Sequence, residues 1–204
     1  MYREAEAKRM LAEHEDRLCG CVLRGLALYR DVDPGFRRVV GLRSDASNRN
    51  DLIWHELRKE FDGGAGIQFI SSQNRKLMAF GQDFLFRVKK LNDQMRPCNN
   101  PTQTSLGFLV QDEPESLPGF EGLVKLDGIT KIDLSYRLAG PFEEYVSVYL
   151  RCPDGVFDYG WLWELGEGLE IPAVVGTITP PPGPGQPRVR LRQETAEKDA
   201  EEQN

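Results

Sequence analysis

The segment that decides the fold is residues 67–91, IQFISSQNRKLMAFGQDFLFRVKKL. Apolar residues dominate three short runs in it, at 67–72, 76–80 and 84–91, and the runs are separated by Gln73-Asn74 and Gly81-Gln82. Both breaks contain residues that tolerate a positive φ angle. The segment therefore predicts three antiparallel strands joined by tight turns.

Further strands are predicted in the last third of the chain. Apolar and polar residues alternate in 131–138, 145–151 and 159–165, and Gly140-Pro141 and Asp154-Gly155 supply turns between these runs. Asn100-Pro101 is typical of a helix start, and a helix is expected from there to about residue 110. We expect an α+β fold, with helices packed on a mostly antiparallel sheet of five or six strands.

Residues 2–30 are predicted to form one long helix. Its apolar stripe repeats at a near-heptad spacing through Leu11, His14, Leu18, Cys21, Val22, Gly25, Leu28 and Tyr29. Such a seam is compatible with a coiled-coil arm that forms a homodimer. Because it covers fewer than four heptads and includes a histidine and a glycine, we favour a helix that packs on the core of its own domain.

A second helix is predicted at about 47–62, before the strand segment. Ile53, Trp54, Leu57 and Phe61 form its buried stripe, Ser44 and Ser47 are candidate N-caps, and Gly63-Gly64 ends it. Glu56 and Glu60 are expected on the solvated side of this helix, because their neighbours take the core positions.

The chain is predicted to hold a single α+β domain at 1–176, in which 1–31 is the N-terminal helix, and a disordered tail at 177–204. The tail begins with a run rich in proline and glycine, PPPGPGQP at 180–187, which favours extended structure without regular hydrogen bonds. Three arginines at 188–192 and a mostly acidic end at 193–204 follow it.

Composition predicts a cytoplasmic protein that has no membrane partner. No apolar run reaches the roughly 18 residues that span a bilayer, and the N-terminus MYREAEAKRM lacks a secretory signal. The four cysteines, Cys19, Cys21, Cys98 and Cys152, follow no zinc-binding spacing and are expected to be reduced thiols. No glycine-rich nucleotide loop or catalytic signature occurs, so no cofactor, metal or catalytic residue is assigned.

One surface stands out from strand alternation. Phe84, Phe86 and Val88 point to one side of their strand, and Arg87 and Lys89 point to the other. In 131–138 the same alternation separates Ile132, Leu134, Tyr136 and Leu138 from Asp133, Ser135 and Arg137. If the core takes the apolar sets, the opposite face gathers Arg87, Lys89 and Arg137, with Lys90 and Arg96 nearby in sequence. An ordinary sheet face with cross-strand ion pairs would explain the same pattern.

These cations suggest a non-catalytic binding or regulatory module with a protein or nucleic-acid partner. The chain has a net charge of −6, which does not favour a general nucleic-acid binder, so the segregation of cations carries this hypothesis. Tyr145 and Tyr149 are expected on one side of their strand, where aromatic side chains could stack among the cations.

The order helix, three strands, helix, strand over residues 47–138 resembles the core of restriction-endonuclease-like nucleases. In that family, an acid and an acid-x-Lys pair on adjacent strands bind a divalent metal. Here Arg87-Val88-Lys89 has arginine where the acid should stand, and Asp83 is a full strand away from Lys89. A divergent metal-dependent nuclease is the alternative function, and an accessory protein of a bacterial defence or toxin–antitoxin system is a third.

Overall fold

The computed structural model describes residues 1–72, 75–98, 107–111, 128–140, 143, 145–155 and 158–166, apart from the side chains of 34, 38 and 72. The chain divides into two units, Met1–Ala173 and Val174–Asn204, and every described residue belongs to the first. The predicted tail at 177–204 and most of the helix expected from residue 100 lie outside the described residues. The domain boundary at 176 stays a prediction.

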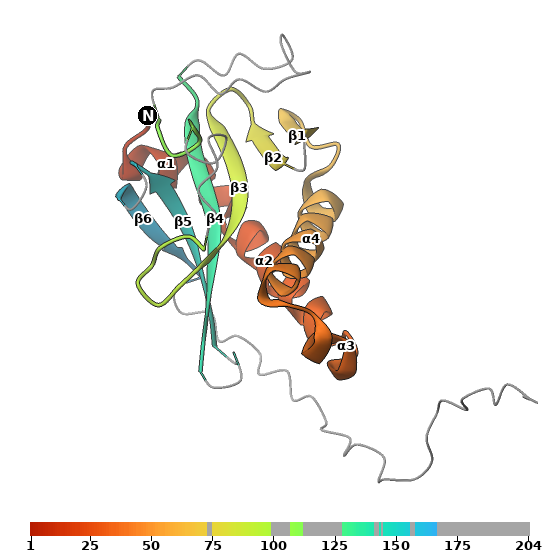
Figure 1. Ribbon diagram of the computed structural model, residues 1–204. Helices are drawn as coiled ribbons and strands as arrows, with labels where there is room; N and C mark the ends of the chain where they lie inside the picture. Colours follow the sequence, from red (N-terminus) through yellow and green to blue (C-terminus); the bar gives the residue numbers. More distant parts are fainter. Residues whose placement is uncertain are drawn as a thin grey trace, which may run out of the picture. The chain divides into compact units, whose positions relative to one another are not determined.

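Four α-helices and one short 3₁₀ turn lie before the first strand (Figure 1): α1 at Glu4–Leu11, η1 at Ala12–His14, α2 at Glu15–Arg30, α3 at Pro34–Val39 and α4 at Leu42–Phe61. The prediction of one continuous helix over 2–30 is wrong, because the 3₁₀ turn interrupts it. This turn places His14 edge-on against the rings of Phe80 and Phe61, with centroid distances of 5.2 and 6.0 Å. Packing of the histidine against the sheet therefore accompanies the break.

The sheet contains six strands in sequence order: β1 at Ile67–Ser72, β2 at Arg75–Phe80, β3 at Phe84–Leu91, β4 at Thr130–Ala139, β5 at Tyr145–Pro153 and β6 at Tyr159–Leu165. All neighbours are antiparallel except β3 and β4, which are parallel. The α+β class with a mostly antiparallel sheet is confirmed. A parallel pair needs a long connection, and residues 92–129 supply it.

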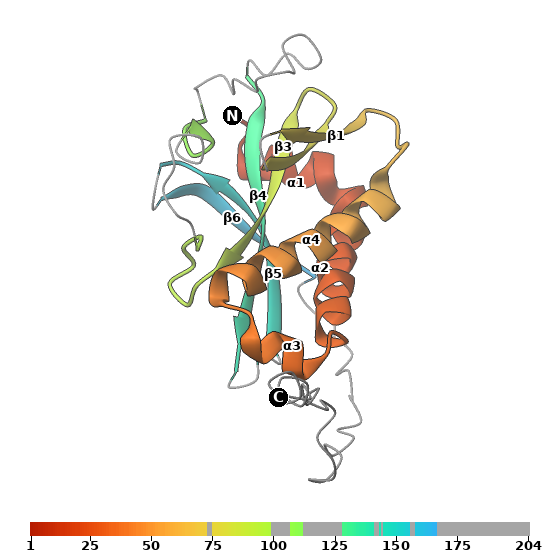
Figure 2. The same cartoon turned by 45° about the vertical axis from the view of Figure 1, so that its right-hand side comes forward.

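The helices cover one face of this sheet, as the two views show (Figure 2). The predicted stripe of α4 is buried: Ile53, Trp54, Leu57 and Phe61 are at most 3% exposed. The helix begins at Leu42 with Gly41 as its N-cap, five residues before its predicted start at 47. Gly25 of α2 lies against the backbone of Ile53, where an added Cβ would come within 2.6 Å of the Ile53 Cα. Close approach of α2 and α4 therefore requires this glycine.

Glu56 corrects one expectation about α4. It was predicted on the solvated side, but it is only 4% exposed. Its Oε2 accepts a hydrogen bond from Arg24 Nε of α2 at 2.8 Å, and Arg24 also reaches Glu60 at 3.2 Å. A buried carboxylate needs such a partner, so this ion pair joins α2 to α4. The seam of α2 thus packs within the domain, as favoured above.

Candidate binding site on the second sheet face

The sheet face opposite the helices carries most of the candidate site and has a mixed character. The predicted core face is confirmed, since Phe84, Phe86, Val88, Ile132, Leu134 and Tyr136 lie in the cluster that the helices cover. On the second face, Ile70, Leu77, Ala79 and Leu85 form a smaller apolar cluster with Phe108 and Ile129. The cations of the second face lie beyond this cluster: Arg75, Arg87, Lys89, Lys131, Arg137 and Arg151. Its described strand carboxylates are Asp133 and Glu164.

Residues 107–111 cover part of the second face. The Lys131 ammonium donates to the carbonyl oxygens of Gly107 and Val110 at 2.9 and 2.7 Å. The side chain of Gln111 bonds to both backbone groups of Lys131 and to the Pro153 carbonyl, at 2.8 to 2.9 Å. Lys131 is fully buried. This lysine therefore anchors the covering segment, and its charge is not presented at the surface.

Arg87 corrects the central expectation about this face. It was predicted to point outward, but its side chain is 8% exposed and is paired with Asp133. Its Nε donates to Asp133 Oδ1 at 2.5 Å, and its guanidinium carbon lies 4.0 Å from the centroid of the Phe108 ring. Parallel pairing of β3 with β4 places the two residues opposite each other. The cross-strand ion pair considered above therefore exists at this position.

A second arginine completes a buried triad. Arg151 of β5 stands opposite Asp133 on the other side, and its Nη1 donates to Asp133 Oδ2 at 3.0 Å. Its Nη2 donates to the Asp158 carbonyl at 2.7 Å. Arg151 and Asp133 are fully buried. Removing one member of such a buried network leaves a charge uncompensated. The triad Arg87–Asp133–Arg151 thus fixes the register of β3, β4 and β5.

Lys89 lies one row further along the same face, opposite Ser135. Burial is the largest cause that lowers the pKa of its ammonium; with the charges of Arg87 and Arg75, and partly offset by Asp133, it brings this pKa to about 8. Tyr149 of β5 flanks Ser135 on the other side and is 6% exposed. The environment of Lys89 therefore disfavours the charged form of its own side chain. A bound anion would stabilise that charged form.

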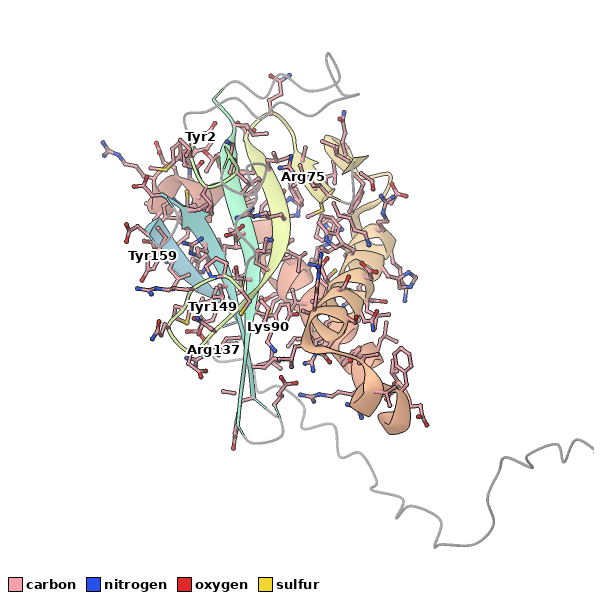
Figure 3. The ribbon with its side chains drawn as sticks, viewed as in Figure 1. Tyr2, Arg75, Lys90, Arg137, Tyr149 and Tyr159 are labelled. Atoms are coloured by element: carbon pink, nitrogen blue, oxygen red, sulfur yellow. The ribbon has the colours of Figure 1, made fainter. Side chains whose placement is uncertain are left out.

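Arg137 lies at the end of this row of cations, half-buried and opposite Ser147 of β5. Its Nε is buried without a hydrogen-bond partner, and it forms no ion pair with the described part of the chain. Figure 3 shows Arg137 and Tyr149 near the same end of the sheet, with Arg75 towards the other end. We call Lys89, Arg137, Ser135 and Tyr149 the cationic row. A guanidinium with unused donors next to a desolvated ammonium is suited to an anion.

The remaining predicted site residues lie at the margin of the cationic row. Lys90 points to the other side of β3, where its ammonium is 3.3 Å from Glu143 Oε1. Arg96 is exposed in the loop after β3, and Asn92 Oδ1 accepts a hydrogen bond from its backbone N–H at 2.9 Å. The structure therefore brings Lys89 and Arg137 together, uses Arg87 inside the fold and leaves Lys90 on a different surface.

Of the nuclease layout, the described residues show the helix α4, the three strands β1–β3 and the later strand β4; the helix expected between β3 and β4 lies mostly outside them. Asp83 accepts a hydrogen bond from the Tyr2 hydroxyl at 2.6 Å, Glu56 is paired with Arg24, and Asp133 lies between two arginines. Among the described residues, no group of three or more His, Cys, Asp or Glu side chains is placed to hold a metal ion. The nuclease alternative stays a prediction.

The cysteines are free thiols. Burial raises the pKa of Cys19 to about 11 and those of Cys21 and Cys152 to about 12. Because the thiolate is the nucleophile and the metal ligand, these three side chains act as small apolar residues at neutral pH. Cys98 is exposed.

Comparison of the chain with protein-family models, curated proteins and solved structures finds no match. No helix in the part of the chain described by the model is both long and apolar enough to cross a bilayer.

Proposed function

We propose that this protein is a non-catalytic binding or regulatory module that recognises an anionic partner, a protein or a nucleic acid, through the cationic row. The observation that carries the proposal is the juxtaposition of Arg137 with Lys89. Arg137 has donors that no described side chain uses, and Lys89 lies in surroundings that lower its pKa to about 8. A partner's carboxylate or phosphate would stabilise both cations.

The location of the row supports a macromolecular partner. Arg137 and Lys89 are partly exposed, whereas Arg87, Lys131 and Arg151 are buried and bound to protein groups. The contact surface is therefore the C-terminal end of β3 and β4. Tyr149 lies on the same face, separated from Lys89 by Ser135, and its ring is mostly buried. Stacking rings among cations are found in single-stranded nucleic-acid sites, and acidic peptides bind arginine-rich surfaces.

Charge reversal tests the proposal. Lys89→Glu with Arg137→Glu should weaken binding of a labelled single-stranded oligonucleotide or a labelled glutamate-rich peptide by about ten-fold or more in fluorescence anisotropy at low salt. The new glutamate at 89 would meet the charges of Arg87 and Arg75 as well as that of Asp133, so circular dichroism of the double variant checks that the fold is kept. Arg9→Glu with Lys59→Glu is the matched control, since both residues are exposed on helices and the charge change is equal.

The two probes also separate the partner classes. Binding of the oligonucleotide alone identifies a nucleic-acid partner, and binding of the peptide alone identifies an acidic protein. Equal weakening by the two double variants would show a general charge effect and remove the cationic row as the site, as would unchanged binding by the Lys89/Arg137 variant.

A further inference from the structure

A second surface, at the α3 end of the helical layer, exposes large apolar side chains. Val39 and Leu42 are 80% and 91% exposed, and Phe36 is 49% exposed. Leu28, at the end of α2, is 39% exposed. Single exposed apolar residues are ordinary, but three within seven residues at one corner of a fold mark an interaction site. We call Phe36, Val39 and Leu42 the apolar knob.

The knob is held by regular structure. Asp33 caps α3 by accepting a hydrogen bond from the Phe36 backbone N–H at 3.0 Å, and Pro34 occupies the first turn. Phe36 and Val39 are three residues apart, so they share one side of α3. Leu42 follows Gly41, the N-cap of α4. The three side chains therefore project from fixed positions and need little ordering on binding.

The base of the knob is fixed to the sheet. The Tyr29 hydroxyl, at the end of α2, donates to Asp45 Oδ1 at 2.5 Å, and Arg49 bridges Asp45 and Glu143 at 2.9 and 2.6 Å. Arg30 donates to the Glu143 carbonyl at 2.9 Å. Glu143 lies between β4 and β5 in the chain. The network therefore joins α2 and α4 to Glu143.

Two arginines with described side chains, Arg37 and Arg43, are sequence neighbours of the knob residues. Arg37 and Arg43 form no ion pair with the described residues, and the Nε of Arg37 is buried without a partner. Arg38 is adjacent in sequence. Of the neighbouring acids, Asp33 is engaged as the α3 cap and Asp45 with Tyr29 and Arg49, while Asp31 is exposed after the end of α2. The surface is therefore apolar at its centre and positively charged at its rim.

We propose that the knob docks into an apolar groove of a partner protein whose rim carries carboxylates. A short helix that presents residues three apart is the usual anchor of helix-in-groove recognition, and aromatic and arginine side chains are enriched in such contacts. Charge complementarity specifies the acidic rim. This surface is separate from the cationic row, so the proposal does not depend on the proposed function.

Two other occupants fit less well. A second copy packed knob against knob would bring Arg37 and Arg43 close to their counterparts, and like charges destabilise an interface. An anionic bilayer would attract the rim, but the chain has a net charge of −6 and three apolar side chains give only shallow insertion. A partner groove satisfies both the apolar centre and the rim.

The test begins with a photo-crosslinking amino acid at position 39 of the full chain, expressed in its native cells. The same residue at position 55 is the control, because His55 is also exposed, at 67%, further along α4. Mass spectrometry then identifies the partner and the crosslinked segment. The proposal expects a partner captured from position 39 only, through a segment that is apolar with nearby Asp or Glu.

Affinity for that purified partner completes the test. Val39→Ser with Leu42→Ser, and separately Arg43→Glu, should each raise the Kd by about ten-fold or more, with unchanged melting temperature because these side chains are exposed. The control variant His55→Ser should change the Kd for the partner by less than about two-fold.

Several outcomes would overturn the proposal. These are equal capture from positions 39 and 55, no capture, and a crosslinked segment without acids. A crosslink to a second copy, with a dimer in sedimentation that Val39→Ser/Leu42→Ser abolishes, would assign the knob to self-association. Sedimentation with phosphatidylcholine/phosphatidylglycerol vesicles that the same variant abolishes would assign it to membranes.

Discussion

The two faces of the sheet use the same strands but are stabilised differently. On the face under the helices, apolar residues of β3, β4 and β5 are buried among one another. On the second face, a single carboxylate, Asp133, lies between Arg87 and Arg151, and the cationic row follows it. A packed apolar core tolerates volume-conserving replacements, whereas a buried ion network depends on each charged member. The second face is therefore the part of the domain where single charges should decide stability and where we propose that they decide binding.

The largest expected effect is on the triad. Asp133→Asn keeps the size of the side chain but leaves two buried arginines without a carboxylate, and it should lower the free energy of unfolding by about 3–5 kcal/mol. Urea denaturation measures this change. Asp154→Asn, at an exposed residue on the same side of the domain, is the control and should stay within about 0.5 kcal/mol. A similar small effect at Asp133 would show that the triad does not stabilise the fold.

The helical face is tested at its closest contact. Gly25→Ala places a methyl group against the Ile53 backbone and should destabilise by about 1–3 kcal/mol in the same assay. Gly20→Ala is the matched helix substitution, since its Cβ would meet only the flexible end of Arg24 at 3.0 Å. The better helix propensity of alanine should make that variant neutral or slightly more stable. Equal effects at both positions would contradict the close packing of α2 on α4.

Titration of Lys89 should make the free energy of unfolding depend on pH. Its folded pKa of about 8 is below the ordinary 10.5, so between these values the unfolded chain binds more protons. The contribution of Lys89 to the free energy of unfolding should therefore rise with pH across this window, by about 1–3 kcal/mol. The buried cysteines act in the opposite direction above about pH 9, since their folded pKa values are raised. The free energy of unfolding is therefore measured against pH for the native chain and for Lys89→Met, and the difference between the two is compared. A difference that does not change with pH would contradict the lowered pKa of Lys89.

The smallest expected effect on stability is at Arg137. Arg137→Gln should change the free energy of unfolding by less than about 0.5 kcal/mol, because this guanidinium forms no ion pair with the described residues. The same variant should weaken partner binding, which separates binding from folding. A loss of several kcal/mol in urea denaturation would instead place Arg137 among the structural cations.

The features that depend on local sequence patterns, namely the strands and the buried side of α4, could be predicted from the sequence. Apolar runs bounded by turn residues located β1 to β3, alternation located β4 to β6, and the stripe of Ile53, Trp54, Leu57 and Phe61 located the buried side of α4. The start of α3 was also readable, because Asp33 followed by Pro34 is a favoured cap and first turn. No helix was predicted at these residues.

Pairings between distant residues could not be read in the same way. Asp133 meets Arg87 only because β3 and β4 run parallel, and Glu56 is buried only because Arg24 of another helix reaches it. Alternation assigns a charged side chain to a face, but it does not reveal a partner 46 residues away. Lys89 and Arg137 were placed correctly on one face, while Arg87 was wrongly expected to be open to solvent.

We propose that the desolvated Lys89 ammonium binds an anionic partner. Nitrogen-edited NMR can measure the pKa of this ammonium in the free protein and in its complex with the bound probe. We expect a pKa of about 8 in the free protein and a higher pKa in the complex. A value near the ordinary 10.5 in the free protein, or one that the bound probe does not change, would contradict it.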